Sequence, residues 1–102
     1  MREKTIEQKL VSETKKRGGL AWKFVSPGIA GVPDRIVLMP GGHIAFVETK
    51  APGGKPRPVQ NLRHKQIRRL GFRVFVLDDT ADIARVLDEI GGEEHGTYDR
   101  TD

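Results

Sequence analysis

The sequence predicts an α/β sandwich, a mixed central sheet with helices on both sides, in the chain order α-β-β-β-α-β-α. Three observations point to this fold class. Apolar residues recur at helical spacing near both ends of the chain, two short apolar runs in its middle are separated by a glycine-containing turn, and a further apolar strand follows a central helix after a short link. At 102 residues the chain is long enough for one hydrophobic core, so we expect a single domain over residues 1–90.

The first two predicted elements are a helix and a strand. Residues Glu3–Arg17 predict an amphipathic helix that ends before Gly18. Its apolar stripe contains Ile6, Leu10 and Val11. Residues Leu20–Val25 have the composition and alternation of a strand. We expect Trp22 in this strand to be a core residue or a partly buried packing residue, with stacking on a nucleic-acid base as the alternative.

A β-hairpin is predicted in the middle of the chain. The apolar runs Ile36–Met39 and Ile44–Val47 are joined by a Pro-Gly-Gly-His turn. The start of one antiparallel strand lies beside the end of the next, so Asp34 and Glu48, at the outer ends of the two runs, should be neighbours. Lys50 is two residues beyond Glu48 and therefore shares its face of the strand.

The second half of the chain predicts a helix over Pro58–Leu70, a strand over Phe72–Leu77 and a helix over Ala81–Ile90. The nearly continuous apolar run of the strand indicates burial on both faces, as in a central or parallel strand. The helix before it has apolar positions at Val59, Leu62, Ile67 and Leu70. Its remaining surface is polar and strongly basic: Gln60, Arg63, His64, Lys65, Arg68 and Arg69. Residues 91–102 are polar, and we expect a flexible tail.

The composition indicates a cytoplasmic protein with a polyanionic partner. The first 90 residues hold 17 basic and 10 acidic side chains, a net charge of +7. No apolar run approaches the roughly 20 residues that span a bilayer, and the N-terminus has no secretory pattern. Cysteine is absent, which excludes disulfides and thiolate metal sites. The three histidines lack metal-ligand spacing, which argues against a histidine-based zinc site.

Asp34, Glu48 and Lys50 form the candidate chemical group. Two neighbouring carboxylates repel each other, and a hard divalent cation such as Mg²⁺ removes that conflict. A lysine beside the cation can orient or deprotonate a water, or neutralise charge that develops on a phosphate. On these three residues alone, a strand end with a solvated ion pair explains the pattern equally well.

The residues around this group resemble the PD-(D/E)xK nuclease pattern. Gly31-Val32-Pro33-Asp34 and Glu48-Thr49-Lys50 are similar to motifs of the virus-type replication-repair nuclease (VRR-NUC) domain. Glu7 on the first helix and Gln60 at the start of the later helix match two further positions of that family. The resemblance extends from about residue 5 to residue 90. It implies a restriction-endonuclease-like fold and a metal-dependent nuclease.

The resemblance also implies a role for each matched residue. Asp34 and Glu48 would bind Mg²⁺ or Mn²⁺ together with the main-chain carbonyl of Thr49, and Lys50 would activate or position the attacking water. Glu7 and Gln60 would be auxiliary catalytic residues that orient a metal-bound water or the substrate. Glu7 would reach the metal through a water.

Basic residues beside the candidate site are expected to contact DNA. The irregular loop 51–58 and the helix after it carry Lys55, Arg57, Arg63, Lys65 and Arg68. A mobile loop and a solvated helix face are the alternatives for these residues. The chain has one cleavage centre, and cutting both strands of a branched or junction DNA needs two, so we expect a homodimer.

The resemblance adds structure-selective cutting of branched or junction DNA, such as a Holliday junction, as the expected specificity. A replication-repair setting in a bacterium or a phage-infected host cell would suit such an enzyme. Two other functions remain open. One is a basic DNA- or RNA-binding module without catalysis, which would be indifferent to a chelator. The other is a restriction-type, sequence-specific endonuclease that uses the same site.

Overall fold

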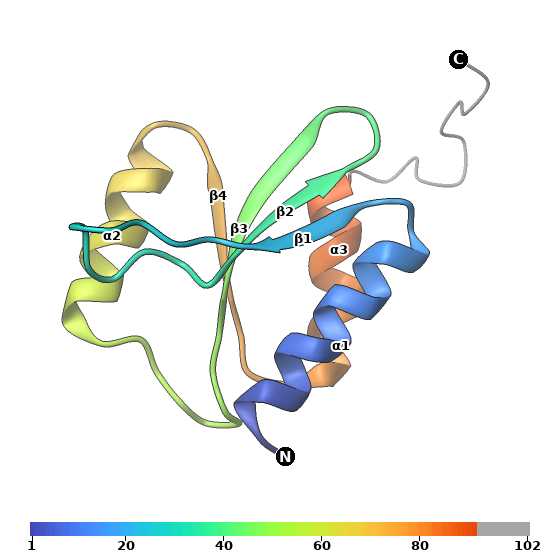
Figure 1. Ribbon diagram of the computed structural model, residues 1–102, viewed down its shortest axis with the longest axis horizontal. Helices are drawn as coiled ribbons and strands as arrows, with labels where there is room; N and C mark the ends of the chain where they lie inside the picture. The colour runs from blue at the N-terminus through green and yellow to red at the C-terminus, as the bar shows by residue number, and fades with distance from the viewer. Residues whose placement is uncertain (92–102) are drawn as a thin grey trace.

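The computed structural model describes residues 1–91 and confirms the predicted α/β sandwich (Figure 1). The elements are α1 (Glu3–Lys16), β1 (Leu20–Lys23), β2 (Arg35–Met39), β3 (His43–Thr49), α2 (Pro58–Arg69), β4 (Arg73–Leu77), the short 3₁₀ helix η1 (Thr80–Asp82) and α3 (Ile83–Gly91). The expected tail lies outside the described residues except for Gly91, which ends α3. No helix within residues 1–91 is long and apolar enough to cross a membrane.

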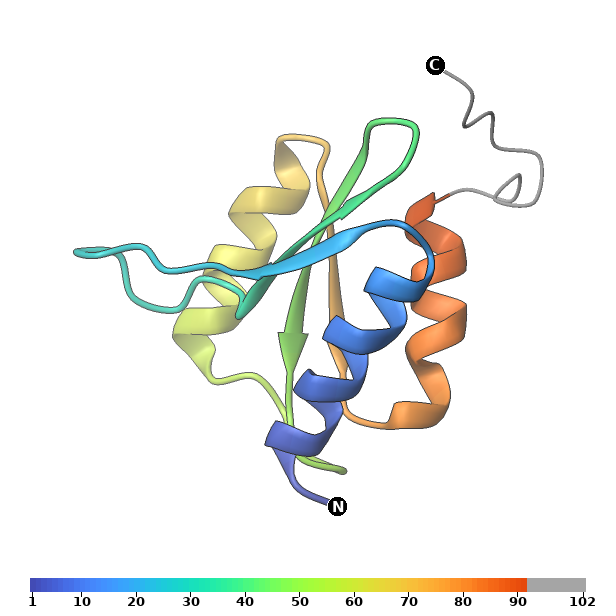
Figure 2. The same ribbon diagram turned by 45° about the vertical axis from the view of Figure 1, so that its right-hand side comes forward.

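The four strands form one sheet in the order β1-β2-β3-β4. β1 pairs with β2, and β2 with β3, in antiparallel fashion, and the second pair is the predicted hairpin. β3 and β4 are parallel and are connected through α2. α2 lies on one side of the sheet, and α1 and α3 lie on the other (Figures 1 and 2).

The hydrophobic core fills the space between the sheet and the α1–α3 layer. One cross-strand row, Ala21 with Val37 with Ala45, is buried throughout. From the helices, the predicted apolar stripes pack onto this face of the sheet with Ile6, Leu10, Ile83, Val86, Leu87 and Ile90. Because side chains alternate along a strand, the residues on either side of this row point to the opposite face.

That opposite face is only partly covered. Its rows join Leu20 with Leu38 and Ile44, and Trp22 with Ile36 and Phe46. The expectation of a buried or partly buried Trp22 is wrong, because its side chain is 58% exposed. Trp22 lies on the face away from Ala21, and α2 packs instead against β4, at the other edge of the sheet.

β4, the strand that we expected to be buried on both faces, is only partly buried. β4 is parallel to its neighbour, as predicted, but it is an edge strand. Val74 and Leu77 are buried, whereas Val76 is exposed.

Candidate active site

Asp34 and Glu48 meet where β2 begins and β3 ends, as the hairpin predicts. The Asp34 carboxylate is anchored to Thr49: its Oδ2 accepts hydrogen bonds from the Thr49 backbone N–H at 2.8 Å and from the Thr49 hydroxyl at 2.9 Å. Asp34 also acts on Glu48, because its charge and a side-chain hydrogen bond both raise the pKa of Glu48. Asp34 is therefore held at the residue that follows Glu48, close enough for its charge to act on the Glu48 carboxylate.

Glu48 is enclosed by polar groups, and its side chain is only 1% exposed. Oε2 accepts a hydrogen bond from Gln60 Nε2 at 3.1 Å and lies 3.7 Å from Lys50 Nζ. Oε1 lies 3.4 Å from His64 Nε2. Burial, followed by the nearby Asp34, raises the pKa of Glu48 from 4.5 to about 7, although the Lys50 ammonium acts in the opposite direction.

The amide of Gln60 has a defined orientation. Its Oε1 accepts a hydrogen bond from the Arg57 backbone N–H at 2.8 Å, at the start of α2. Its nitrogen is therefore the atom that faces Glu48. Gln60 thus joins the first turn of α2 to the carboxylate of β3.

The face of α2 that docks on the sheet is the polar one. Gln60 and His64 are its buried residues, whereas Leu62 is 49% exposed and Leu70 is 76% exposed. Leu62 and Leu70, two of the four apolar positions that helical spacing selects, therefore do not lie on the inner face of this helix. The physical reason is Glu48, a polar group on the facing sheet that needs polar partners.

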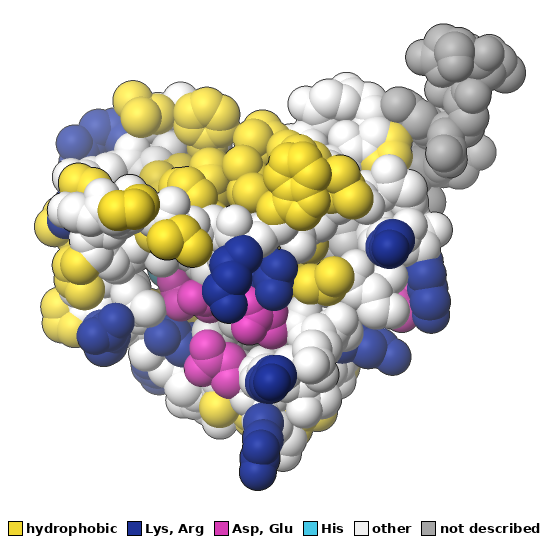
Figure 3. Space-filling view, in the orientation of Figure 1, with side chains coloured by type: hydrophobic (Ala, Val, Ile, Leu, Met, Phe, Trp, Pro, Cys, Tyr) yellow, Lys and Arg dark blue, Asp and Glu magenta, His cyan; other side chains and the backbone are white. Residues whose placement is uncertain are grey.

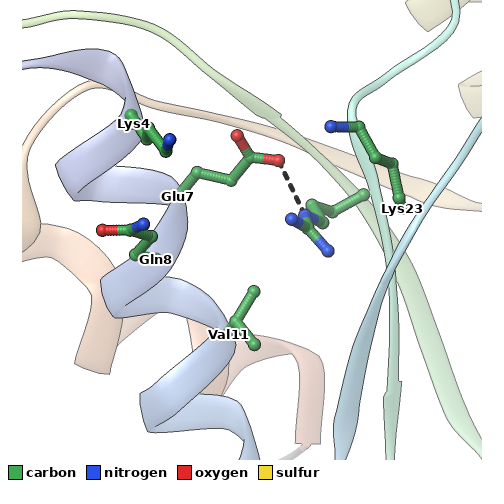
Figure 4. A pocket seen from close by; sticks show the side chains of 6 residues that line it. Lys4, Glu7, Gln8, Val11 and Lys23 are labelled. Atoms are coloured by element: carbon green, nitrogen blue, oxygen red, sulfur yellow. Dashed lines mark hydrogen bonds and ion pairs between the residues drawn. The ribbon is translucent and has the colours of Figure 1, made fainter.

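Glu7 is engaged with Arg35 on the α1 side of the sheet (Figure 4). Its Oε2 accepts a hydrogen bond from Arg35 Nε at 2.8 Å, and both side chains are 18% exposed. Arg35 also donates to the Ala21 carbonyl at 3.0 Å. The two residues line a pocket together with Lys4, Gln8, Val11 and Lys23. The regular alternation of β2 and β3 places this pair across the sheet from Glu48.

Two residues near Glu48 were not singled out from the sequence. His64 is buried against Glu48, and the available signal was its spacing of four residues from Gln60, which puts both on one helix face. Glu3, in the first turn of α1, contributes a small further increase to the pKa of Glu48. The sequence offered no signal for Glu3.

The basic residues proposed to contact nucleic acid differ in their exposure and in their hydrogen bonds. Lys55, Arg57, Lys65 and Arg68 are exposed. Arg63 Nε donates to the Ala30 carbonyl at 2.7 Å, which fastens the β1–β2 loop to α2, and Arg68 donates to the Val74 carbonyl at 2.7 Å. In Figure 3, acidic side chains gather at the centre of one face of the molecule, with Lys and Arg side chains around them.

The donor atoms suit a hard divalent cation. Within residues 1–91, no three or more His, Asp or Glu side chains are gathered in a way that could hold a metal ion. The carboxylates of Asp34 and Glu48 are the two side-chain groups at this place that could serve as oxygen ligands. Their proximity raises the pKa of Glu48, and a cation between two such groups would relieve the repulsion. Carboxylate and carbonyl oxygens are ligands of Mg²⁺ and Mn²⁺.

No protein-family model matches the sequence, but a curated protein and a solved structure are similar to the chain. The chain is 54% identical, over 87 residues, to "Putative nuclease p44" of Acyrthosiphon pisum secondary endosymbiont phage 1, and the match covers 85% of this chain and 92% of that protein. A solved structure of a VRR_NUC domain matches with a TM-score of 0.79 and 31% identity, over 84% of this chain and 94% of the other. The chain belongs to the VRR-NUC domain family of nucleases.

Proposed function

We propose that this nuclease is a metal-dependent endonuclease that hydrolyses phosphodiester bonds in DNA. The observation that supports this most directly is the position of Asp34, which is hydrogen-bonded to Thr49 between Glu48 and Lys50, with Lys50 Nζ 3.7 Å from the Glu48 carboxylate. A fold has little structural reason to bring two carboxylates together in a buried place, whereas a divalent cation requires it.

Asp34, Glu48 and the main-chain carbonyl of Thr49 would hold Mg²⁺ or Mn²⁺. When bound, the metal would stabilise negative charge on the scissile phosphate and on the leaving oxygen. The residues of the chain supply the rest. Thr49 fixes the Asp34 carboxylate, Gln60 fixes that of Glu48, and Lys50 orients or activates the attacking water. Glu7 keeps its proposed role of acting on the metal through a water, although its carboxylate is paired with Arg35 on the α1 side of the sheet.

The substrate in this proposal is branched or junction DNA, cut by a homodimer. Lys55, Arg57, Arg63, Lys65 and Arg68 would contact the phosphate backbone beside the site. One chain holds one candidate centre, so two strands of a junction require two copies. Two copies could associate through the open sheet face, where the apolar side chains of Leu20 and Trp22 are exposed.

The decisive experiment incubates the protein with a four-way junction, a flap and a linear duplex, each with Mg²⁺, Mn²⁺ or EDTA. We expect cleavage with either metal, none with EDTA, and a preference for the junction. Asp34→Asn and Lys50→Ala should remain folded and bind DNA, with cleavage reduced about 100-fold or more. Lys16→Ala is a matched control that removes an exposed charge at the far end of α1 and should cleave like the wild type.

Each outcome that contradicts the proposal would point to a specific alternative. Binding that is unaffected by EDTA and leaves the DNA intact would indicate a non-catalytic module. Cleavage at one fixed sequence in the linear duplex would indicate a restriction-type enzyme. Unchanged cleavage by Asp34→Asn would remove Asp34 from the mechanism.

A further inference from the structure

The docked face of α2 consists of polar residues that converge on one carboxylate. Gln60 and His64 are buried to 7% and 1% exposure, and both contact Glu48. Burying an amide and an imidazole is unfavourable unless each finds a partner, and an apolar pair would dock a helix at lower cost. The choice of residues is therefore better explained by what they do to Glu48 than by helix packing.

The two residues hold different oxygens of the same group. Gln60 Nε2 contacts Oε2 at 3.1 Å, and His64 Nε2 contacts Oε1 at 3.4 Å. The last torsion of a glutamate side chain is otherwise broad, so one contact leaves the carboxylate free to rotate. Two contacts, from positions one helical turn apart on a single helix, fix its plane.

The imidazole is placed to act as a hydrogen-bond donor to Glu48. One of the two neutral forms of the ring carries its N–H on Nε2, which lies 3.4 Å from Oε1. Together with the Gln60 amide, the ring then restrains both oxygens of the carboxylate.

We propose that His64 is a positioning residue that holds the Glu48 carboxylate in the orientation in which it binds metal together with Asp34. This role rests on the proposed metal-dependent function. The VRR-NUC motif residues matched in this chain do not include it. Partners of metal-binding carboxylates typically change metal affinity 10–100-fold when they are removed.

The test measures Mn²⁺ binding to the DNA-free protein by titration calorimetry, together with kcat and KM for junction cleavage. His64→Leu should weaken Mn²⁺ binding about 10-fold or more and lower kcat at limiting metal, with KM for DNA unchanged. His64→Gln places an N–H near the position of Nε2 and should stay within about 3-fold of the wild type. His43→Gln is the matched control, since His43 is exposed at the start of β3, and it should bind Mn²⁺ like the wild type.

A folded His64→Leu protein with wild-type Mn²⁺ affinity would overturn the proposal. If the leucine variant does not fold, His64→Asn replaces it, because the asparagine amide reaches the position of Nδ1 and not that of Nε2. Weak Mn²⁺ binding by His64→Asn with near-normal binding by His64→Gln supports the proposal, and equal affinities refute it. A wild-type protein that neither binds Mn²⁺ nor cuts DNA would overturn the proposed function itself, which distinguishes the two failures.

Discussion

Burial and the neighbouring Asp34 give Glu48 a pKa of about 7, so the metal-free protein keeps a proton there that the unfolded chain releases near pH 4.5. Because the folded-state pKa is the higher one, the stability that Glu48 contributes is fully present below pH 4.5 and is lost as the pH rises through about 7. The corresponding free energy is on the order of 3 kcal/mol. His64 acts in the opposite direction, because its lowered pKa makes the folded state less stable as the pH falls below 6.5.

The variant Glu48→Gln isolates the contribution of the carboxylate, because His64 is present in both proteins. In EDTA, the free energy of unfolding of the wild type minus that of Glu48→Gln should decrease by about 3 kcal/mol between acidic pH and neutrality. Denaturant unfolding of both proteins at several pH values measures this difference in the free energy of unfolding. A difference that does not change with pH would show that Glu48 is not the titrating group. Cleavage should rise over the same range, because the proposed metal would bind the deprotonated carboxylate.

The ion pair between Glu7 and Arg35 calls for a separate measurement, since the same glutamate is proposed to act on the metal. The pair is half-buried, with 2.8 Å between Arg35 Nε and Glu7 Oε2. We expect a coupling energy of about 1 kcal/mol between Glu7→Ala and Arg35→Ala in EDTA. The double-mutant cycle formed by these two substitutions cancels the energy of the hydrogen bond from Arg35 to the Ala21 carbonyl, because that bond is lost whenever Arg35 is replaced.

Mn²⁺ affinity then separates the two roles of Glu7. Weaker Mn²⁺ binding by Glu7→Gln would support a contribution to the metal site in addition to the ion pair. A coupling energy near zero would mean that the pair contributes nothing to stability.

Among the elements, the hairpin was predictable and the docking of α2 was not. Antiparallel pairing follows from two apolar runs and a turn, and it brings Asp34 beside Glu48 without further information. The inner face of α2 depends on Glu48, which lies 12 residues before Gln60 and on another element. Helical periodicity reports apolar burial alone, so it selected Leu62 and Leu70 and overlooked His64.

The Gly-Val-Pro-Asp segment shows how a loop and a helix can fix the site together. Gly31 has φ +87°, and a Cβ placed there would lie 2.7 Å from the Val59 carbonyl oxygen in α2. Gly28 in the same loop has φ +85° with no atom within 4 Å of such a Cβ. Both glycines therefore have a positive φ, but only Gly31 lies so close to α2 that a side chain would not fit.

This pair allows a matched prediction. Gly28→Ala should cost about 1 kcal/mol of stability, because alanine strains a positive φ. Gly31→Ala should cost about 2 kcal/mol or more and should also reduce cleavage, because the loop that leads to Asp34 must move away from α2. Denaturant unfolding and junction cleavage of both variants give the comparison. Equal effects of the two substitutions would mean that contact with α2 does not position the loop.

The domain taken together combines a basic body with an open apolar face. The net charge of +7 over the first 90 residues makes two copies repel each other at most contacts. The cross-strand rows with Leu20 and Trp22 contain no charged side chain. In Figure 3, hydrophobic side chains gather in the upper part of the view. Phe46 belongs to the Trp22 row, and its ring lies 5.4 Å from that of Phe24 and 6.3 Å from that of Phe72.

The proposed homodimer should therefore form through this face. We expect sedimentation equilibrium at micromolar concentration to give a dimer for the wild type and a monomer for Trp22→Arg, because a two-fold interface sets each new charge against its copy. Leu70→Arg adds the same charge at a more exposed residue just after α2 and should remain dimeric. A monomeric wild type would refute the dimer. If Trp22→Arg stayed dimeric but bound single-stranded DNA less tightly, Trp22 would be a base-stacking residue, because an exposed indole offers the same flat apolar surface to a base.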